Sequence, residues 1–230
     1  MSLLIVCAAE ESMANQFTMP EYTFIGDGAL DKAESQIKKL GGKALIVTGK
    51  VIGSSYIAVQ LEEKLDEWGI HHVIFCGITG EPTDLMVQAA AELYADEQCD
   101  FIIGLGGGSP LDSAKAAAVL AGLGGKITDY AGKEITGIIP PLVLIPTTAG
   151  TGSETTQFTV ITDTAANIKM LLKGHVLLPT VAVVDPVYST DAPKGITVAT
   201  GMDALTHAVE AYTSRKAFPL TDCYALEVIK

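Results

Sequence analysis

The feature that most constrains this chain is a run of three glycines, Gly106–Gly108, between a short apolar stretch and the start of a helix. Residues 100–104 (Asp-Phe-Ile-Ile-Gly) are typical of a buried strand in a parallel sheet. After the glycines, Ser109 is expected to be the N-cap, with Pro110 in the first helical position and Asp112 three residues after the cap. The sequence here predicts a strand, a glycine turn and a helix start in succession.

This arrangement predicts an anion-binding site. Glycines let backbone N–H groups approach a ligand closely, and a helix N-terminus concentrates unpaired N–H donors and about half a positive charge. The pyrophosphate of a dinucleotide is the ligand we expect. A tight turn before an ordinary helix is the alternative, although one glycine would suffice for that. The spacing meets neither the G-x-G-x-x-G fingerprint nor the Walker A pattern, so on its own it indicates a phosphate-binding turn.

Composition limits the possible functions. The chain has 230 residues, of which 48% are hydrophobic and 18% charged, which suits one large or two modest globular domains. The formal charge of −12 and the lack of a basic stripe exclude a nucleic-acid partner. No apolar run is long enough to span a bilayer, so we expect no membrane partner. Scattered cysteines without a C-x-x-C pair or an N-glycosylation sequon favour a reducing cytoplasm.

The N-terminus carries a short apolar segment without the features of a signal peptide. No Lys or Arg precedes that segment, and Glu10 and Glu11 follow it at once. We expect residues 1–12 to be a non-native or disordered extension, with Met13 as a plausible start.

Strands and helices alternate along most of the chain. Strands are predicted at residues 22–25, 43–48, 72–76, 100–104, 142–145 and 181–184, and helices at about 30–40, 57–68, 84–96 and 109–123. This order predicts an α/β fold: a Rossmann-like parallel sheet with helices on both faces. Residues 157–162 and 168–172 flank a polar turn and predict an antiparallel hairpin.

The pattern changes near the C-terminus, where residues from Pro193 onward are helical without further strands. We therefore expect a dinucleotide-binding α/β domain at residues 13–188. Residues 189–230 are expected to be the start of a helical domain, which the family resemblance given below implies is all-helical and metal-binding.

Hydroxyl side chains gather in a second stretch, at the carboxyl end of the predicted strand 142–145. Thr147, Thr148, Thr151 and Ser153 lie in a glycine-punctuated loop. Ligands of open α/β sheets bind outside the carboxyl ends of the strands, and hydroxyls can donate to ribose or phosphate oxygens. Local turns stabilised by these side chains are the alternative.

Asp203 and His207 form the third candidate site. Their spacing of four residues places a carboxylate and an imidazole on one helix face, a donor set that suits Fe²⁺ or Zn²⁺. The alternative is a surface or helix-capping pair. Glu210 is expected to be an outer or solvent-facing group. Lys169 lies in the predicted hairpin, where a strand lysine is solvent-facing by default.

With these motifs in place, the chain resembles the iron-containing (group III) alcohol dehydrogenases from about Thr23 to Lys230. Three motifs in order, together with the pair Asp185-Pro186, carry the resemblance: residues 106–115 (GGGSPLDSAK), 145–154 (IPTTAGTGSE) and 199–212 (ATGMDALTHAVEAY).

The resemblance implies an enzyme that transfers hydride between NAD or NADP and a primary alcohol or diol, or its aldehyde, with a divalent metal polarising the alcohol oxygen. It implies that Gly106–Ser109 hold the pyrophosphate, that Thr147 and Thr148 lie along the cofactor, and that Lys169 reaches the nicotinamide ribose. A homo-oligomer is expected. The cofactor-binding residues are expected to be Gly49, Gly106, Gly107, Gly108, Ser109, Asp112, Thr147, Thr148, Thr151 and Lys169, and the metal ligands Asp203 and His207.

Two departures from the family pattern stand out. Many members have an aspartate, which binds the adenosine ribose, where this chain has Gly49 followed by Lys50. Since glycine leaves space and lysine offers positive charge, we expect NADP to be accepted and even preferred.

The second departure concerns the metal ligands, because two further histidine ligands are expected beyond Lys230. We therefore expect this chain, truncated naturally, by proteolysis or by design, to bind dinucleotide, to hold metal weakly and to be inactive, with apolar surface exposed at residues 193–230.

Other functions remain open at this point. Glycerol dehydrogenase and dehydroquinate-synthase-like enzymes share the implied scaffold, but their motifs differ from those of this chain. A non-catalytic dinucleotide-binding module is the alternative outside catalysis. The coding sequence after Lys230 distinguishes them, because an open frame with further histidines favours the enzyme.

Overall fold

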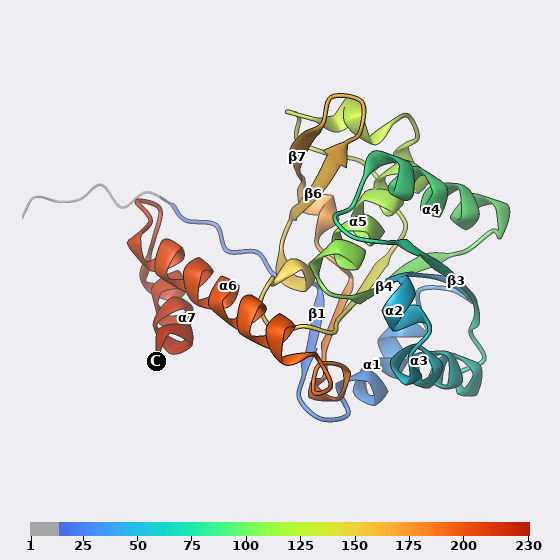
Figure 1. The fold of residues 1–230 in the computed structure, drawn as a ribbon, viewed down its shortest axis with the longest axis horizontal. Coiled ribbons are helices and arrows are strands. Elements are labelled where there is room, and N and C mark those ends of the chain that lie inside the picture. Colours follow the sequence, from blue (N-terminus) through green and yellow to red (C-terminus); the bar gives the residue numbers. More distant parts are fainter. Residues whose placement is uncertain (1–13) are drawn as a thin grey trace, which may run out of the picture.

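A computed structural model describes residues 14–230, and the expected extension at residues 1–12 lies outside this range. The centre of the fold is a six-stranded sheet in which all neighbouring strands are parallel (Figure 1). In spatial order its strands are β1 (Tyr22–Ile25), β8 (Val181–Val184), β5 (Leu142–Pro146), β4 (Phe101–Gly106), β2 (Lys43–Gly49) and β3 (His71–Ile78). The predicted α/β class and the predicted strands are confirmed.

Helices cover both faces of this sheet, as the alternating sequence pattern predicts. They are α1 (Ala29–Ile37), α2 (Lys50–Gly53), α3 (Tyr56–Glu67), α4 (Asp84–Asp96) and α5 (Gly108–Leu123), with short 3₁₀ turns at Ile127–Tyr130, Ser153–Thr155, His175–Leu177 and Pro186–Tyr188. α1 and α3 pack on one face, and α4 and α5 pack on the other. Thr83 caps α4 by accepting a hydrogen bond from the Met86 N–H at 3.3 Å.

The central strand β4 shows why the sheet is apolar on both sides. All six of its residues are buried. Ile102 packs into the cluster under α4 and α5, whereas Phe101 and Ile103 pack into the cluster under α1 and α3. Because successive side chains of a strand point to opposite faces, a continuous apolar run is what a strand covered on both faces requires. This strand ends in the glycine turn and anchors it.

The predicted hairpin is also confirmed. β6 (Phe158–Asp163) and β7 (Ile168–Lys173) form a separate two-stranded antiparallel sheet. Ile161, Met170 and Leu172 join the apolar cluster under α4 and α5. The hairpin therefore lies on the α5 side of the main sheet.

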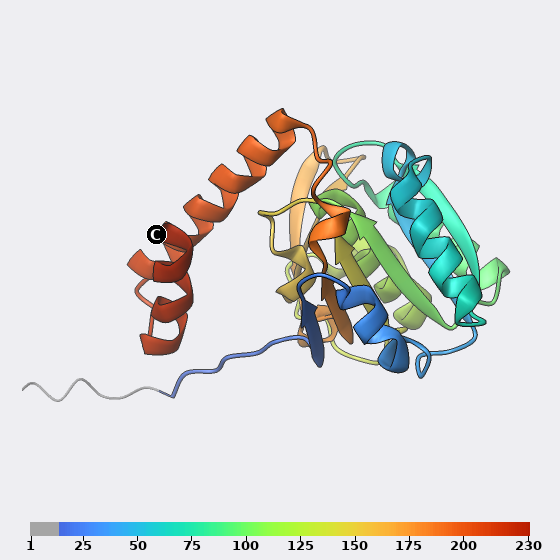
Figure 2. The same ribbon diagram turned by 90° about the horizontal axis from the view of Figure 1, so that it is seen from below.

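The C-terminal segment extends away from the α/β body as an arm of two helices, α6 (Lys194–Thr213) and α7 (Pro219–Ile229) (Figures 1 and 2). Of the described side chains of this arm, Ala208 in α6 and Ala225 in α7 are the buried ones. Its exposed apolar residues include Ile196, Val198, Met202, Val209, Tyr212, Leu220, Tyr224, Leu226, Val228 and Ile229. The expectation that residues 193–230 expose apolar surface is confirmed.

This exposed surface predicts self-association. We expect the chain to form oligomers whose population rises with concentration, because the arm leaves apolar side chains in water. Analytical ultracentrifugation checks this, with Val198→Lys/Met202→Lys expected to shift the chain toward monomer. Wild-type chain that stays monomeric across the concentration range would contradict the expectation.

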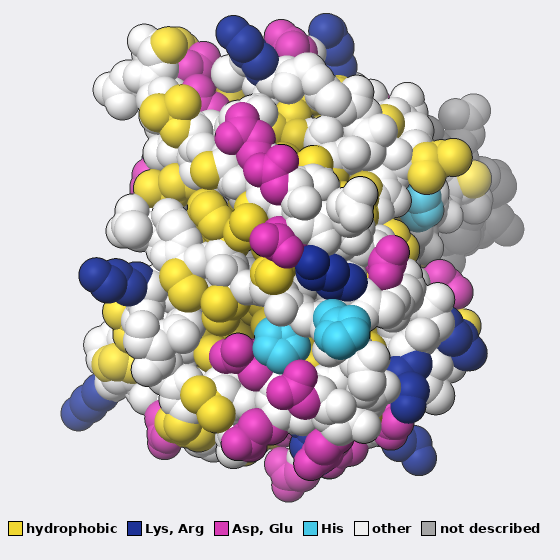
Figure 3. Space-filling view, turned by 90° about the vertical axis from the view of Figure 1, so that its right-hand side faces the viewer, with side chains coloured by type: hydrophobic (Ala, Val, Ile, Leu, Met, Phe, Trp, Pro, Cys, Tyr) yellow, Lys and Arg dark blue, Asp and Glu magenta, His cyan; other side chains and the backbone are white. Residues whose placement is uncertain are grey.

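Charged side chains of both signs are mixed on the surface. On the face shown in Figure 3, Lys and Arg side chains are scattered among acidic ones and form no basic stripe. Among the described helices, none combines the length and apolarity that crossing a membrane requires.

Candidate functional site

Three candidate segments meet at the carboxyl edge of the main sheet. β4 lies between β2 and β5, with Thr48 paired to Leu105 and Gly106 paired to Pro146. Gly49 and the glycine turn Gly106–Gly108 therefore end adjacent strands. The loop that begins at Thr147 follows the third strand. This edge is where ligands of open α/β sheets bind.

The glycine turn has the backbone that the sequence suggests, but the helix starts earlier than predicted. Gly106 has φ +148°, and a Cβ at this position would lie 2.6 Å from Cγ of Pro110, so glycine is required here. The N-cap is Gly107 rather than Ser109, and its carbonyl accepts from the Leu111 N–H at 3.3 Å. The predicted N-cap and the first-position Pro110 are therefore wrong. Extended Gly107 lets the helix begin one residue after it, so no side chain caps α5.

The threonine loop lies against this turn. The Thr147 N–H donates to the Gly106 carbonyl at 2.9 Å. A Cβ added to Gly107 would lie 3.4 Å from Oγ1 of Thr148, and one added to Gly108 would lie 3.1 Å from Cγ2 of Thr151. The Thr148 hydroxyl oxygen is buried and has no hydrogen-bond partner among the described residues. An unpartnered hydroxyl beside an uncapped helix N-terminus is a donor set that fits a phosphate group.

Thr48 is a candidate site residue that sequence reasoning missed. It is fully buried at the end of β2, and its hydroxyl also has no partner in the described part of the chain. Its position directly before Gly49, at the carboxyl end of a predicted strand, is the signal that could have found it.

Asp112 is held by the protein itself. Its carboxylate accepts from the Ser153 hydroxyl at 2.6 Å and from the Val160 N–H at 2.8 Å. Burial raises the pKa of Asp112, while these hydrogen bonds lower it. Both carboxylate oxygens of Asp112 accept these hydrogen bonds and so fix the loop after β5. The expected contact between Asp112 and a cofactor stays a prediction.

Lys169 and Gly49 have contacts that the sequence does not reveal. Nζ of Lys169 forms an exposed ion pair of 2.5 Å with Glu81, in the loop after β3. A Cβ at Gly49 would lie 2.8 Å from the carbonyl oxygen of Ile78, so this glycine also permits a close approach to β3. Lys50 is exposed at the start of α2.

Asp203 and His207 lie on one face of α6, as their spacing predicts. Oδ1 of Asp203 is 3.7 Å from Nε2 of His207. Two ligand atoms at about 2.0–2.2 Å from one ion lie at most about 4.4 Å apart, so this separation is compatible with a shared metal. No group of three potential metal-ligating side chains is found within residues 14–230. The pair brings two potential donor atoms together, and its role as metal ligands stays a prediction.

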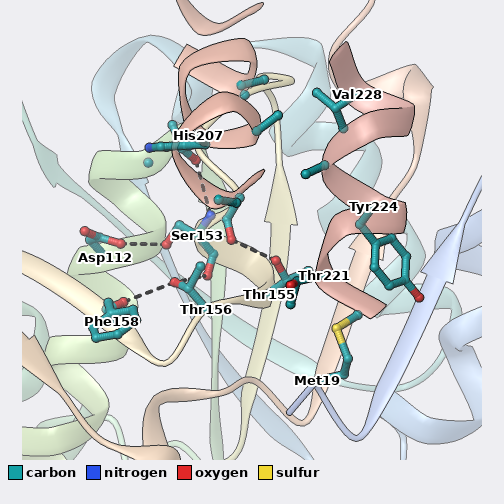
Figure 4. Close-up of a pocket in the computed structure, with 18 of the residues that line it drawn as sticks. Met19, Asp112, Ser153, Thr155, Thr156, Phe158, His207, Thr221, Tyr224 and Val228 are labelled. Carbon is teal, nitrogen blue, oxygen red and sulfur yellow. Dashed lines mark hydrogen bonds between the residues drawn. The ribbon is translucent and has the colours of Figure 1, made fainter. Parts of the chain in front are cut away.

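The start of α5, the loop after β5 and the helices α6 and α7 line a common cavity of about 800 Å³ (Figure 4). It lies between the helical arm and the loop after β5, and most of its lining is apolar. His207 of α6 faces it from one side, and Ser153, Thr156 and Phe158 line the opposite side. The metal-ligand candidate and the polar loop therefore share one cavity.

The sequence of the α/β body matches a family model described as iron-containing alcohol dehydrogenase, over residues 20–186. This chain belongs to the iron-containing alcohol dehydrogenase family. A second model, for the C-terminal part of Fe-containing alcohol dehydrogenases, matches residues 197–230.

Relatives within the iron-containing alcohol dehydrogenases are about 40% identical. The NAD-dependent methanol dehydrogenase of Bacillus methanolicus is 41% identical over 93% of this chain and 57% of its own length. The 1,3-propanediol dehydrogenase of Citrobacter freundii is 40% identical over 93% of this chain and 56% of its own length. The chain therefore spans somewhat more than half of these relatives.

Solved structures of related enzymes are also similar to this chain. A 1,3-propanediol oxidoreductase superposes with a TM-score of 0.90 at 39% identity, covering 94% of this chain and 57% of the other. The sulfoacetaldehyde reductase of Bifidobacterium kashiwanohense in complex with NAD⁺ gives a TM-score of 0.81 at 30% identity, covering 93% and 57%.

Proposed function

We propose that this chain binds a nicotinamide dinucleotide at the carboxyl edge of its sheet and is part of an alcohol dehydrogenase. The reaction is hydride transfer between NAD(P) and a primary alcohol or diol, or the corresponding aldehyde. The observation that carries the proposal is the uncapped N-terminus of α5 beside the unpartnered Thr148 hydroxyl. The family membership and the alcohol and diol dehydrogenases among the relatives support it.

Each part of the site has a role in this proposal. The backbone N–H groups at Gly108 and Ser109 bind the pyrophosphate, and Thr147, Thr148 and Thr151 line the cofactor next to them. Asp203 and His207 contribute to the binding of Fe²⁺ or Zn²⁺. When bound, the nicotinamide carries the hydride and the metal polarises the alcohol oxygen. The largely apolar cavity beside His207 takes the carbon chain of the substrate.

Calorimetric titration with NADP and with NAD at one ionic strength tests the proposal. We expect saturable binding, with NADP equal to or tighter than NAD, because Gly49 brings no carboxylate and Lys50 offers a positive charge to a 2′-phosphate. Lys50→Ala is expected to weaken NADP about fivefold and to leave NAD unchanged. Binding of neither dinucleotide would contradict the proposed function, whereas NAD binding much tighter than NADP would contradict the cofactor choice alone.

Metal binding by this chain is expected to be weak, since two donors are fewer than the three protein ligands of a catalytic zinc site. Titration with Zn²⁺ should show low affinity that His207→Ala lowers at least about tenfold. The matched control is Glu210→Gln, three residues further along the same helix, which should leave Zn²⁺ affinity unchanged. Equal Zn²⁺ affinity in wild type and His207→Ala would show that this pair is not the site.

A further inference from the structure

We propose that Lys115 is a positioning residue for the dinucleotide site: through three hydrogen bonds it holds the loop after β5 in place against the helix that begins at the glycine turn. The proposal rests on the proposed dinucleotide site. Lys115 lies two helical turns from that site and contacts no part of it directly, so its effect would be exerted through the loop.

The free edge of β6 explains why a charged side chain is buried here. Among the described strands β6 pairs with β7, and on its other edge the Thr162 N–H donates to the Pro82 carbonyl at 2.8 Å. The polar backbone groups of this edge nearer Phe158 need other partners. Side chains of α5 supply two of them. Asp112 accepts from the Val160 N–H at 2.8 Å, and Lys115 donates to the Phe158 carbonyl at 2.9 Å. Asp112 and Lys115 thus replace backbone partners at the Phe158–Val160 end of this edge, one as acceptor and the other as donor.

Lys115 is fully buried, and its ammonium group has a complete set of acceptors. Besides the Phe158 carbonyl, Nζ donates to the carbonyl of Thr156 at 2.8 Å and to its hydroxyl at 3.1 Å. An ammonium group has three N–H donors, and all three are used. The spacing of three residues places Asp112 and Lys115 on the same face of α5. This face therefore binds residues 156–160 through one acidic and one basic side chain.

These contacts of Asp112 and Lys115 set the position of the loop after β5 relative to the start of α5, and so the geometry of the proposed site. The same helix α5 begins at the glycine turn, and the same loop carries Thr148 and Thr151 beside that turn. Asp112 adds a hydrogen bond from the Ser153 hydroxyl, and the Thr159 hydroxyl donates to the Asp112 carbonyl at 2.8 Å. Without Lys115, the Thr156 carbonyl would lose its buried donor and the Phe158 carbonyl would keep a 3.5 Å hydrogen bond from the Thr156 hydroxyl, so the loop would shift to reach water. The spacing between the threonine hydroxyls and the helix N-terminus would change with it.

Lys115→Met tests this, because methionine fills a similar volume without a donor. Calorimetry with NADP should show about a tenfold loss of affinity, and hydrogen exchange should accelerate in residues 151–160. If the methionine variant does not fold, Lys115→Gln serves for both measurements: its shorter side chain has two N–H donors for the three acceptors, so it should show smaller losses in the same direction, and no change would overturn the proposal.

Leu65→Ala is the matched control. Leu65 is fully buried in the cluster under α1 and α3, on the opposite face of the sheet, so its truncation lowers Tm without touching the loop. We expect the NADP affinity of Leu65→Ala to stay within twofold of wild type. Together with the loss for Lys115→Met, this result would support a positioning role, because a general loss of stability would lower both affinities. Unchanged affinity and exchange in Lys115→Met would overturn the proposal. If the wild-type chain binds no NADP, the proposed function fails, and the exchange of residues 151–160 alone decides whether Lys115 fixes the loop.

Discussion

Gly107→Asp is expected to lower NADP affinity about 100-fold or more while leaving the free energy of unfolding unchanged or slightly higher. Gly107 is the N-cap of α5 in an extended conformation, and a Cβ there meets nothing closer than 3.4 Å. Aspartate is a favoured N-cap residue, and its carboxylate interacts well with the helix dipole, so the fold tolerates it. The same carboxylate would occupy and neutralise the N–H donors that we assign to the pyrophosphate, and it would repel the phosphates.

Two controls make this prediction specific to the site. Gly107→Ser adds a neutral cap at the same position and should cause a smaller loss of NADP affinity. Gly195→Asp places the same charge in α6, where an added Cβ has open space, and should leave NADP affinity near the wild-type value. NADP binding by Gly107→Asp at wild-type affinity would show that the helix N-terminus does not hold the cofactor.

Lys115 should contribute a rise in the free energy of unfolding between about pH 8 and 10.5. Burial lowers the pKa of Lys115 from 10.5 to about 8, against the opposing effect of Asp112 and Glu154. Between these values the unfolded chain binds a proton that the folded chain does not, so stability increases with pH, by up to about 1.4 kcal/mol per pH unit. Below about pH 8 both states bind the proton, and this dependence disappears.

Urea unfolding of wild type and Lys115→Met across this pH range isolates the effect. Burial raises the pKa values of Cys99 and Tyr94, the latter to about 12, which lowers stability as pH rises through the range where these groups ionise in the unfolded chain. These contributions are common to both proteins and cancel in the difference. The stability of wild type relative to Lys115→Met should therefore increase from pH 8 to 10. A difference that does not change with pH would contradict the lowered pKa of Lys115.

The fold was predictable where one physical signal dominated the sequence. Apolar runs such as the one that became β4 identify strands buried on both faces, because few other elements need them. The polar turn between residues 162 and 168 likewise indicated the hairpin. The start of α5 was not predicted correctly, because Ser109 and Pro110 are statistically good starting residues, whereas the extended conformation of Gly107 decides the cap.

The features that could not be predicted from the sequence depend on contacts between segments far apart in the chain. Lys115 lies in an alanine-rich helix where no local pattern predicts its burial. It is buried because β6, more than forty residues later, needs its donors. The partner of Lys169 is Glu81, 88 residues away in the sequence. By contrast, the helical spacing of Asp203 and His207 was enough to predict that the two side chains meet.

Amide chemical shifts of the chain during titration with NADP test the central claim most directly, because they report both whether the dinucleotide binds and where. The account predicts saturable shifts centred on Gly106–Ser109 and on Thr147–Thr151, with smaller ones at Thr48 and Gly49. Saturable shifts centred elsewhere, or none at NADP concentrations in the millimolar range, would contradict it.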